Sequence, residues 1–152
     1  MTMELIKAVQ SDANELWQMQ KIAFAELLER YKDYETNPAS EPLERTVQRL
    51  CDASSFYFIV ESGEKVGAVR VVEGGERKRI SPIFIMPQHR RKGLAQQAIR
   101  LAEQLHGERG WELSTILQEA GNCRLYEKLG YRRTGQVQRI NERMDLVFYE
   151  KD

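Results

Sequence analysis

The chain has 152 residues, a length typical of a single domain that can bury a core without disulfides or metals. Its 23 Lys and Arg balance 23 Asp and Glu, and this formal net charge of +0 argues against a nucleic-acid binder, which normally carries a basic excess. Hydrophobic residues make up 41% of the chain, too large a share for a disordered protein. We therefore expect one folded domain over residues 1–152.

The sequence contains no pattern typical of a metal site or a membrane segment. Cys51 and Cys123 lie far apart and lack the spacing of a disulfide framework or a zinc site. No apolar run approaches about 18 residues, and the first residues do not combine a basic segment with an apolar one. We therefore expect a cytoplasmic protein that binds no metal and no membrane.

The first part of the chain contains one predicted strand and two predicted helices. Residues 5–9 are typical of a short strand. Apolar residues then recur at helical spacing over 13–31, which predicts a helix of about five turns. A polar loop with two prolines covers 32–42, and residues 43–52 favour a second, shorter helix.

After these helices the hydrophobic period changes to that of strands. Compact apolar runs at 56–60, 66–72 and 79–86 are separated by turns that contain glycine, which predicts an antiparallel meander. Pro82 has no backbone N–H to donate to a neighbouring strand. It therefore predicts a bulge or an edge position in the third of these strands.

The rest of the chain is predicted to alternate helices and strands. An apolar stripe predicts a helix from residue 91 or 92 to about residue 109. The remaining predicted elements are a strand at 111–117, a helix at 120–129, and strands at 131–139 and 143–150. Gly130 is well placed to end the second of these helices in a left-handed conformation. The order of elements predicts a mixed α/β fold without a linker.

The segment at 90–95, Arg-Arg-Lys-Gly-Leu-Ala, joins a predicted buried strand to a predicted helix. Backbone N–H groups at a helix start lack intrahelical acceptors and lie at the positive end of the helix dipole, so they can bind an anion. Gly93 lets a phosphate approach the main chain, and the three basic residues before it add charge. The alternative interpretation is a solvated basic turn that binds nothing.

A second segment favours the anion-binding interpretation. Residues 122–131 follow the pattern N-x-x-x-Y-x-x-x-G-Y. Together the two segments resemble the GNAT family of acyl-CoA-dependent N-acyltransferases. Arg90-x-x-Gly93-x-Ala95 resembles that family's Q/R-x-x-G-x-G/A pyrophosphate loop, and 122–131 resembles its N-x-x-x-Y-x-x-x-G-F/Y helix. The predicted order of elements is similar to that of the family along essentially the whole chain.

The resemblance implies a mixed sheet, flanked by helices, that splays between two parallel strands at 79–86 and 111–117. It also implies that acetyl-CoA is the cosubstrate. The residues implied to bind it are Phe84, Ile85, Met86 and Asn122 for the pantetheine, Arg90, Arg91, Lys92, Gly93, Leu94 and Ala95 for the pyrophosphate, and Lys128 for the 3′-phosphate. Lys128 has an alternative interpretation as an ordinary exposed lysine of a helix.

The resemblance implies that Tyr126 is the general acid that protonates the departing thiolate. The alternative is a tyrosine of the core, since aromatic residues on helices usually pack. Many relatives carry a glutamate on the strand before the pyrophosphate loop, and this chain has none there. Glu119 and a water chain therefore remain as candidate bases. His89 lies in the basic turn, where a solvated histidine is the expected state.

The leading hypothesis for function is direct transfer of an acetyl group from acetyl-CoA to a primary amine of a small molecule or peptide. The alternative is a non-catalytic acyl-CoA-binding module or sensor with the same fold. The acceptor site is expected between the first helix, the loop after it and the last two strands. Residues 29–44 contain five carboxylates, and an acidic rim suits a cationic amine. The protein is expected to be a monomer or a homodimer.

Overall fold

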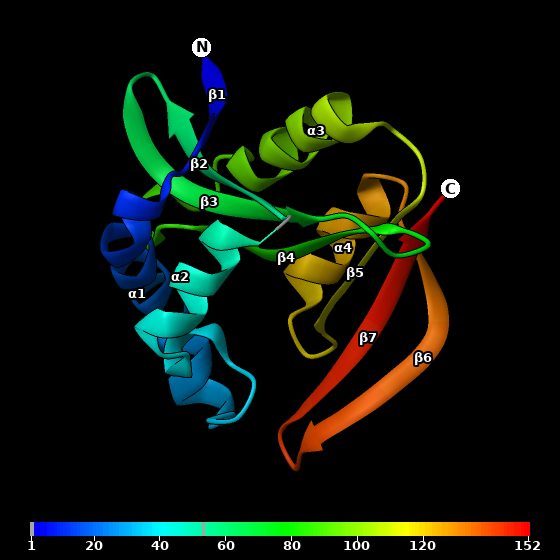
Figure 1. The fold of residues 1–152 in the computed structure, drawn as a ribbon. Helices are drawn as coiled ribbons and strands as arrows, with labels where there is room; N and C mark the ends of the chain where they lie inside the picture. The colour runs from blue at the N-terminus through cyan, green and yellow to red at the C-terminus, as the bar shows by residue number, and fades with distance from the viewer. Residues whose placement is uncertain (1, 53) are drawn as a thin grey trace.

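The computed structural model describes residues 2–52 and 54–152, which form a seven-stranded mixed sheet with helices against it (Figure 1). The strands are β1 (Met3–Lys7), β2 (Ser55–Glu61), β3 (Glu64–Val72), β4 (Lys78–Ile85), β5 (Trp111–Ile116), β6 (Arg132–Asn141) and β7 (Met144–Lys151). The α-helices are α1 (Ala13–Tyr31), α2 (Leu43–Cys51), α3 (Leu94–His106) and α4 (Ala120–Lys128). The strand order is β1-β2-β3-β4-β5-β7-β6. β4 and β5 pair in parallel, and the other neighbouring strands of the described chain pair antiparallel.

The predicted fold class is confirmed, and the ends of its elements differ from the expected ends by a few residues. The helix α3 is shorter at both ends than expected: it begins at Leu94 instead of residue 91 or 92, and it ends at His106 instead of about residue 109. Arg91 and Gly93 have φ angles of 66° and 75°, which a right-handed helix cannot contain. Gly130 follows α4 with a φ of 97°, as expected for a residue that ends a helix.

The helices cover both faces of the sheet. Successive residues of a strand point to opposite faces, so neighbouring residues of β4 contact different helices. In β4, Phe84 belongs to a core that includes Leu16 and Ala23 of α1. The next residue, Ile85, belongs to a second and larger core, whose helical members are Leu94, Ala98, Ile99 and Ala102 of α3 and Cys123 and Tyr126 of α4. The end of β4 is thus held between α1 on one face and α3 and α4 on the other.

A bulge interrupts β4 shortly before the end of the strand. The pairing register with β3 shifts between Val69 and Val71, so that Arg70 stands opposite both Ser81 and Pro82. This confirms the bulge predicted from Pro82. The Arg70 guanidinium donates a hydrogen bond of 2.9 Å to the carbonyl of Ser81, which satisfies an acceptor at the bulge.

β3 and β4 approach each other very closely at Gly67. A Cβ atom at this position would lie 2.1 Å from the carbonyl oxygen of Phe84. No side chain fits there unless β4 moves, so the glycine fixes how far β4 sits from the rest of the meander.

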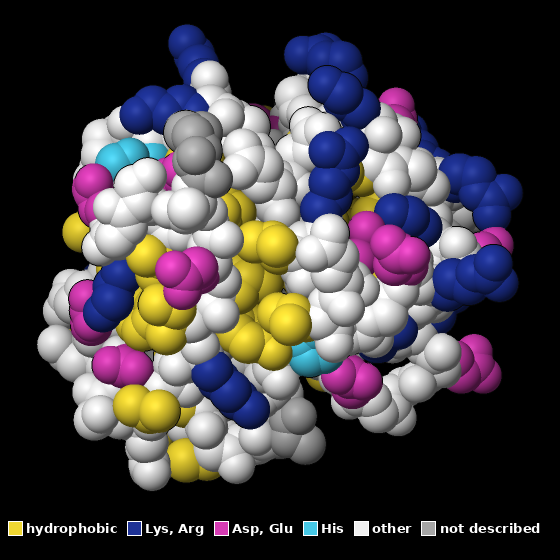
Figure 2. Space-filling view, turned by 90° about the horizontal axis from the view of Figure 1, so that it is seen from above, with side chains coloured by type: hydrophobic (Ala, Val, Ile, Leu, Met, Phe, Trp, Pro, Cys, Tyr) yellow, Lys and Arg dark blue, Asp and Glu magenta, His cyan; other side chains and the backbone are white. Residues whose placement is uncertain are grey.

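The sheet ends at β6, where residues 132–139 are exposed. Figure 2 shows Lys and Arg side chains crowded on the side of the molecule where α4, β6 and β7 lie in Figure 1, although the chain as a whole has no net charge. Among the helices formed by 2–52 and 54–152, none has both the length and the apolar character needed to cross a membrane.

Candidate active site

The site begins where β4 and β5 part. The two strands pair at Lys78–Trp111 and at Arg79–Glu112, and no further pair between them follows within the described residues. Farther along, β4 continues beside β3 and β5 continues beside β7. The sheet therefore opens between its two parallel strands, and this confirms the predicted splay.

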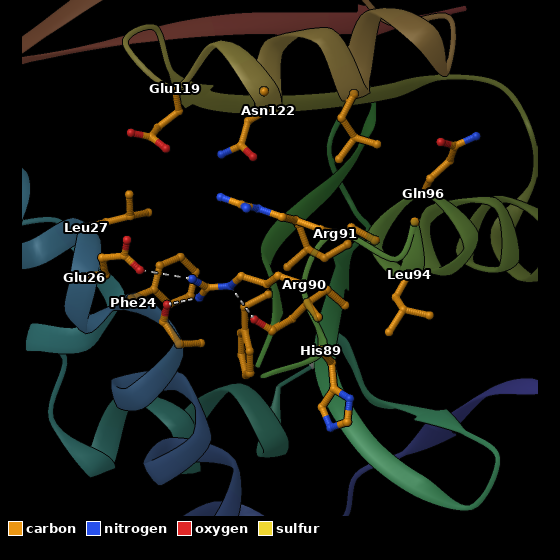
Figure 3. A pocket seen from close by; sticks show the side chains of 18 of the residues that line it. Phe24, Glu26, Leu27, His89, Arg90, Arg91, Leu94, Gln96, Glu119 and Asn122 are labelled. Carbon is orange, nitrogen blue, oxygen red and sulfur yellow. Dashed lines mark hydrogen bonds and ion pairs between the residues drawn. The ribbon is translucent and has the colours of Figure 1, made fainter. Parts of the chain in front are cut away.

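A cavity of about 620 Å³ lies at this opening, between α1, the end of β4, the loop before α3, and α4 (Figure 3). Its volume is in the range of sites that hold a cofactor or a small ligand. Among the residues expected to bind acetyl-CoA, those that line it are Phe84, Ile85, Arg90, Arg91, Gly93, Leu94, Ala95 and Asn122. Three expected residues do not line it: Met86 is buried in the core under α1, and Lys92 and Lys128 are exposed.

The loop before α3 is shaped to present backbone N–H groups. Arg91 and Gly93 are left-handed on either side of Lys92, so the main chain curls just before the helix. The first hydrogen bond of α3 runs from the Gln97 N–H to the Gly93 carbonyl at 3.2 Å. The N–H groups of the first turn precede this bond and are left for an anion, at the positive end of the helix.

The side chains of Arg90 and Arg91 have different surroundings. The Arg90 guanidinium donates to the carbonyl of Ala23 at 2.6 Å and to that of Ile85 at 3.1 Å, and it lies 3.5 Å from Glu26. It thereby ties α1 to the end of β4. Arg91 extends into the cavity in Figure 3, so its charge is the one placed to meet a bound anion.

Tyr126 lies on α4, and its side chain is both buried and part of the cavity wall. The residue is 7% exposed, and its ring centroid lies 6.2 Å from that of Tyr131 and 6.1 Å from that of Tyr149. Burial raises the pKa of the Tyr126 phenol to about 12. The phenol therefore remains protonated at neutral pH and can donate its proton to a group in the cavity.

Glu119 lines the same cavity at the start of α4, but one of its carboxylate oxygens is engaged. Oε2 accepts a hydrogen bond of 2.6 Å from Arg30 and another from the hydroxyl of Tyr31. Burial is the main cause that raises the pKa of Tyr31, and the hydrogen bond to Glu119 raises it further. Glu119 thus joins the end of α1 to the start of α4, and its Oε1 is left to accept a proton.

Several residues of the cavity wall come from α1 and were not expected there. These residues are Ala23, Phe24, Glu26, Leu27 and Arg30. Their spacing of three and four residues places them on one face of the helix. This spacing is visible in the sequence, but it does not predict which part of the protein the face contacts. His89 also lines the cavity, and its Nε2 lies 2.9 Å from Glu64, so it is paired with a carboxylate rather than simply solvated.

A second cavity of about 230 Å³ adjoins the first. The residues that line both are Phe24, Leu27, Ile83, Asn122 and Tyr126. The other walls of the second cavity come from β4, β5, β7 and the loop between α1 and α2. Of the elements expected to form the acceptor site, α1, the loop after it and β7 line this cavity, whereas β4 and β5 line it in place of β6. In the described part of the chain, no three or more His, Cys, Asp or Glu side chains are grouped to hold a metal ion.

Residues 21–131 match the model of the acetyltransferase (GNAT) family. The human protein N-acetyltransferase 8 is 28% identical over 103 residues, which are 60% of this chain and 44% of that protein. The mouse probable N-acetyltransferase family 8 member 5 is 26% identical over 123 residues, which are 73% of this chain and 53% of that protein. The chain thus spans about half the length of the curated relatives it matches.

A likeness to solved structures extends over the whole chain. The PaiA N-acetyltransferase of Thermoplasma acidophilum, solved in complex with coenzyme A, superposes with a TM-score of 0.74 and covers 100% of both chains. The two sequences are 12% identical, so this likeness concerns the fold alone.

Proposed function

Because the chain belongs to the acetyltransferase (GNAT) family, we propose that it transfers the acetyl group of acetyl-CoA to a primary amine of a small molecule or a peptide. The observation that carries this proposal is the opening between β4 and β5, where one cavity is lined by both the loop at the start of α3 and a buried phenol. The pyrophosphate would lie on the N–H groups at the start of α3. The pantetheine would follow the end of β4 toward Tyr126.

The reaction needs a neutral amine, donors for the developing oxyanion and a proton for the departing thiolate. The amine nitrogen attacks the thioester carbonyl carbon, a C–N bond forms, and the C–S bond breaks. The thiolate takes the phenolic proton of Tyr126. The new amide nitrogen releases a proton to Oε1 of Glu119 or to water, and the phenolate of Tyr126 regains its proton from solvent.

The absence of a carboxylate along β4, from residue 78 to residue 85, favours a second candidate function. In this alternative the chain binds acyl-CoA without transferring the acyl group. Arg30 supports the alternative further, because it forms an ion pair with Glu119, the carboxylate expected as a candidate base.

Binding and turnover distinguish these functions. Acetyl-CoA at about 100 times its dissociation constant should stabilise the protein by about 2.7 kcal/mol, which is a readily measured rise in Tm. Release of the CoA thiol should then be followed with a panel of primary amines. An enzyme accelerates release with at least one amine, whereas a binding module shows the rise in Tm alone. No rise in Tm at millimolar acetyl-CoA would contradict both functions.

A further inference from the structure

The cavity of about 230 Å³ that adjoins the acetyl-CoA cavity contains one ionisable carboxylate and no basic side chain among its lining residues. The carboxylate belongs to Asp33, in the loop after α1. The walls are otherwise apolar or neutral and polar; the apolar residues are Phe24, Leu27, Pro38, Ile80, Pro82, Ile83, Leu113, Ile116, Met144 and Leu146. This composition suits a ligand with a hydrocarbon body and a positive charge.

Asp33 is unusual for a carboxylate because it is 3% exposed. Its oxygens accept hydrogen bonds from the backbone N–H of Thr36, at 3.0 Å, and from the hydroxyl of the same residue. Within 2–52 and 54–152, no Lys, Arg or His nitrogen forms an ion pair with it. A buried carboxylate without a cation is costly, so a cationic ligand would gain strongly from binding here.

The other carboxylates of residues 29–44 have different surroundings. Glu29 pairs with Lys32 at 2.9 Å, and Glu41 pairs with Arg49 at 2.9 Å. Glu35 and Glu44 are exposed, and none of these four residues lines either cavity. Of the carboxylates in this segment, Asp33 is thus the one that lines the cavity.

The chemistry of acetyl transfer decides which nitrogen can lie at Asp33. A nearby negative charge favours the protonated form of an amine and raises its pKa. An ammonium paired with Asp33 therefore has no free electron pair with which to attack a thioester. The nitrogen at Asp33 must be a second one, different from the nitrogen that is acetylated near Tyr126.

We propose that the acceptor is a compact aliphatic compound with two basic nitrogens, a diamine, whose remote ammonium binds Asp33 while its other amine is presented to the acetyl group. This inference rests on the proposed function. The hydrocarbon between the two nitrogens lies along the apolar walls of the cavity. These walls include Phe24 and Leu27 of α1. Asp33 determines specificity and takes no part in the proton transfers.

The test compares 1,4-diaminobutane and 1,5-diaminopentane with butylamine and pentylamine, with acetyl-CoA as donor. The diamines should have a kcat/KM at least about tenfold higher than the monoamines, the scale of a desolvated charge pair. In Asp33→Asn this preference should disappear, mainly through a higher KM for the diamine. Binding of 1,4-diaminobutane to the protein with CoA, measured by calorimetry, should weaken by the same factor. Glu35→Gln removes a charge from the same loop without touching the cavity and should keep the preference.

The outcomes separate the inference from the function. Equal use of diamines and monoamines by the wild type, or a preference that survives Asp33→Asn, would overturn the role of Asp33 while acetyl transfer stands. Binding of acetyl-CoA and its effect on Tm should be unchanged in Asp33→Asn, because Asp33 does not line the larger cavity. Absence of CoA release with every amine would overturn the proposed function, and this inference with it.

Discussion

Replacing Tyr126 by Phe tests the proposed general acid through the loss of one oxygen atom. Burial raises the pKa of this phenol to about 12, so the wild-type side chain carries its proton throughout the range of an ordinary assay. General acid catalysis contributes about 10²–10⁴ to a rate. We therefore expect kcat to fall by about 10²–10⁴, or about 3–5 kcal/mol of transition-state stabilisation.

The surroundings of Tyr126 allow this loss to be separated from a loss of stability. Burial and the neighbouring Cys123 raise the pKa of Tyr126, and no hydrogen bond to another described residue is among the causes. The ring contacts with Tyr131 and Tyr149 remain in the variant. We expect the free energy of unfolding to change by less than about 1 kcal/mol. At this chain length such a change shifts Tm by less than about 4 °C. The affinity for acetyl-CoA should stay close to that of the wild type, because the lost interaction belongs to the transition state.

Tyr149→Phe is a matched control on the same aromatic cluster. The Tyr149 hydroxyl donates to Glu127 at 2.8 Å and accepts from Arg133 at 3.3 Å, and the residue lines neither cavity. This variant should lower Tm by a few degrees and leave kcat nearly unchanged. Both variants should be assayed for kcat with saturating acetyl-CoA and an accepted amine, for Tm and for acetyl-CoA affinity. A kcat within about threefold of the wild type in Tyr126→Phe, less than about 1 kcal/mol, would refute the acid role.

Three further outcomes are expected. Gly67→Ala should lower stability by about 1–3 kcal/mol and weaken acetyl-CoA binding, because the new Cβ would lie 2.1 Å from the carbonyl oxygen of Phe84 and must push β4 away. In the control Gly75→Ala the nearest atom lies 3.6 Å from the new Cβ, so Tm and acetyl-CoA affinity should both stay unchanged. Gly93→Asp should abolish the rise in Tm with acetyl-CoA by placing a negative charge in the anion site, and Gly63→Asp, which also has a positive φ and open space around it, should retain that rise. Burial raises the pKa values of Tyr126 and Tyr149 to about 12 from an ordinary value of 10. Their contribution to stability should therefore be complete below pH 10 and be lost as the pH rises from 10 to 12. Over this range Tm should fall less steeply in Tyr126→Phe than in the wild type, and an equal slope would contradict the raised pKa of Tyr126.

The fold could be predicted from the sequence because its local signals agree with one another. The change from helical to strand period before Phe56 and the glycines in the turns agree with the strands and turns of the structure. Pro82 predicted a bulge or an edge position in β4, and the structure has the bulge. The start of α3 was predicted too early. Arg91 has no chemical feature that predicts the positive φ of 66° which keeps it out of the helix.

The parts of the site that could be predicted lie in or next to short sequence motifs. Of the segment 90–95, all residues except Lys92 line the cavity, and Asn122 and Tyr126 of the second motif line it as well. The first helix was expected to border the acceptor site, but the α1 residues that line the larger cavity could not be predicted, because a helix face gives no sign of which surface will cover it. The same limit applies to Asp33, because its burial distinguishes it from the other carboxylates of the segment, and burial depends on the tertiary structure.

β6 has a consequence for how copies of this chain meet at high concentration. As the last strand of the sheet, it leaves one row of backbone N–H and C=O groups open to a strand from another molecule. Its exposed arginines, Arg132, Arg133 and Arg139, would face one another if two such edges paired antiparallel. The positive φ of Gly135 and the shifted register between Arg133 and Val137 also distort the edge. Charge and irregularity together discourage the growth of extended ribbons of molecules, so a long strand can remain uncovered without promoting aggregation.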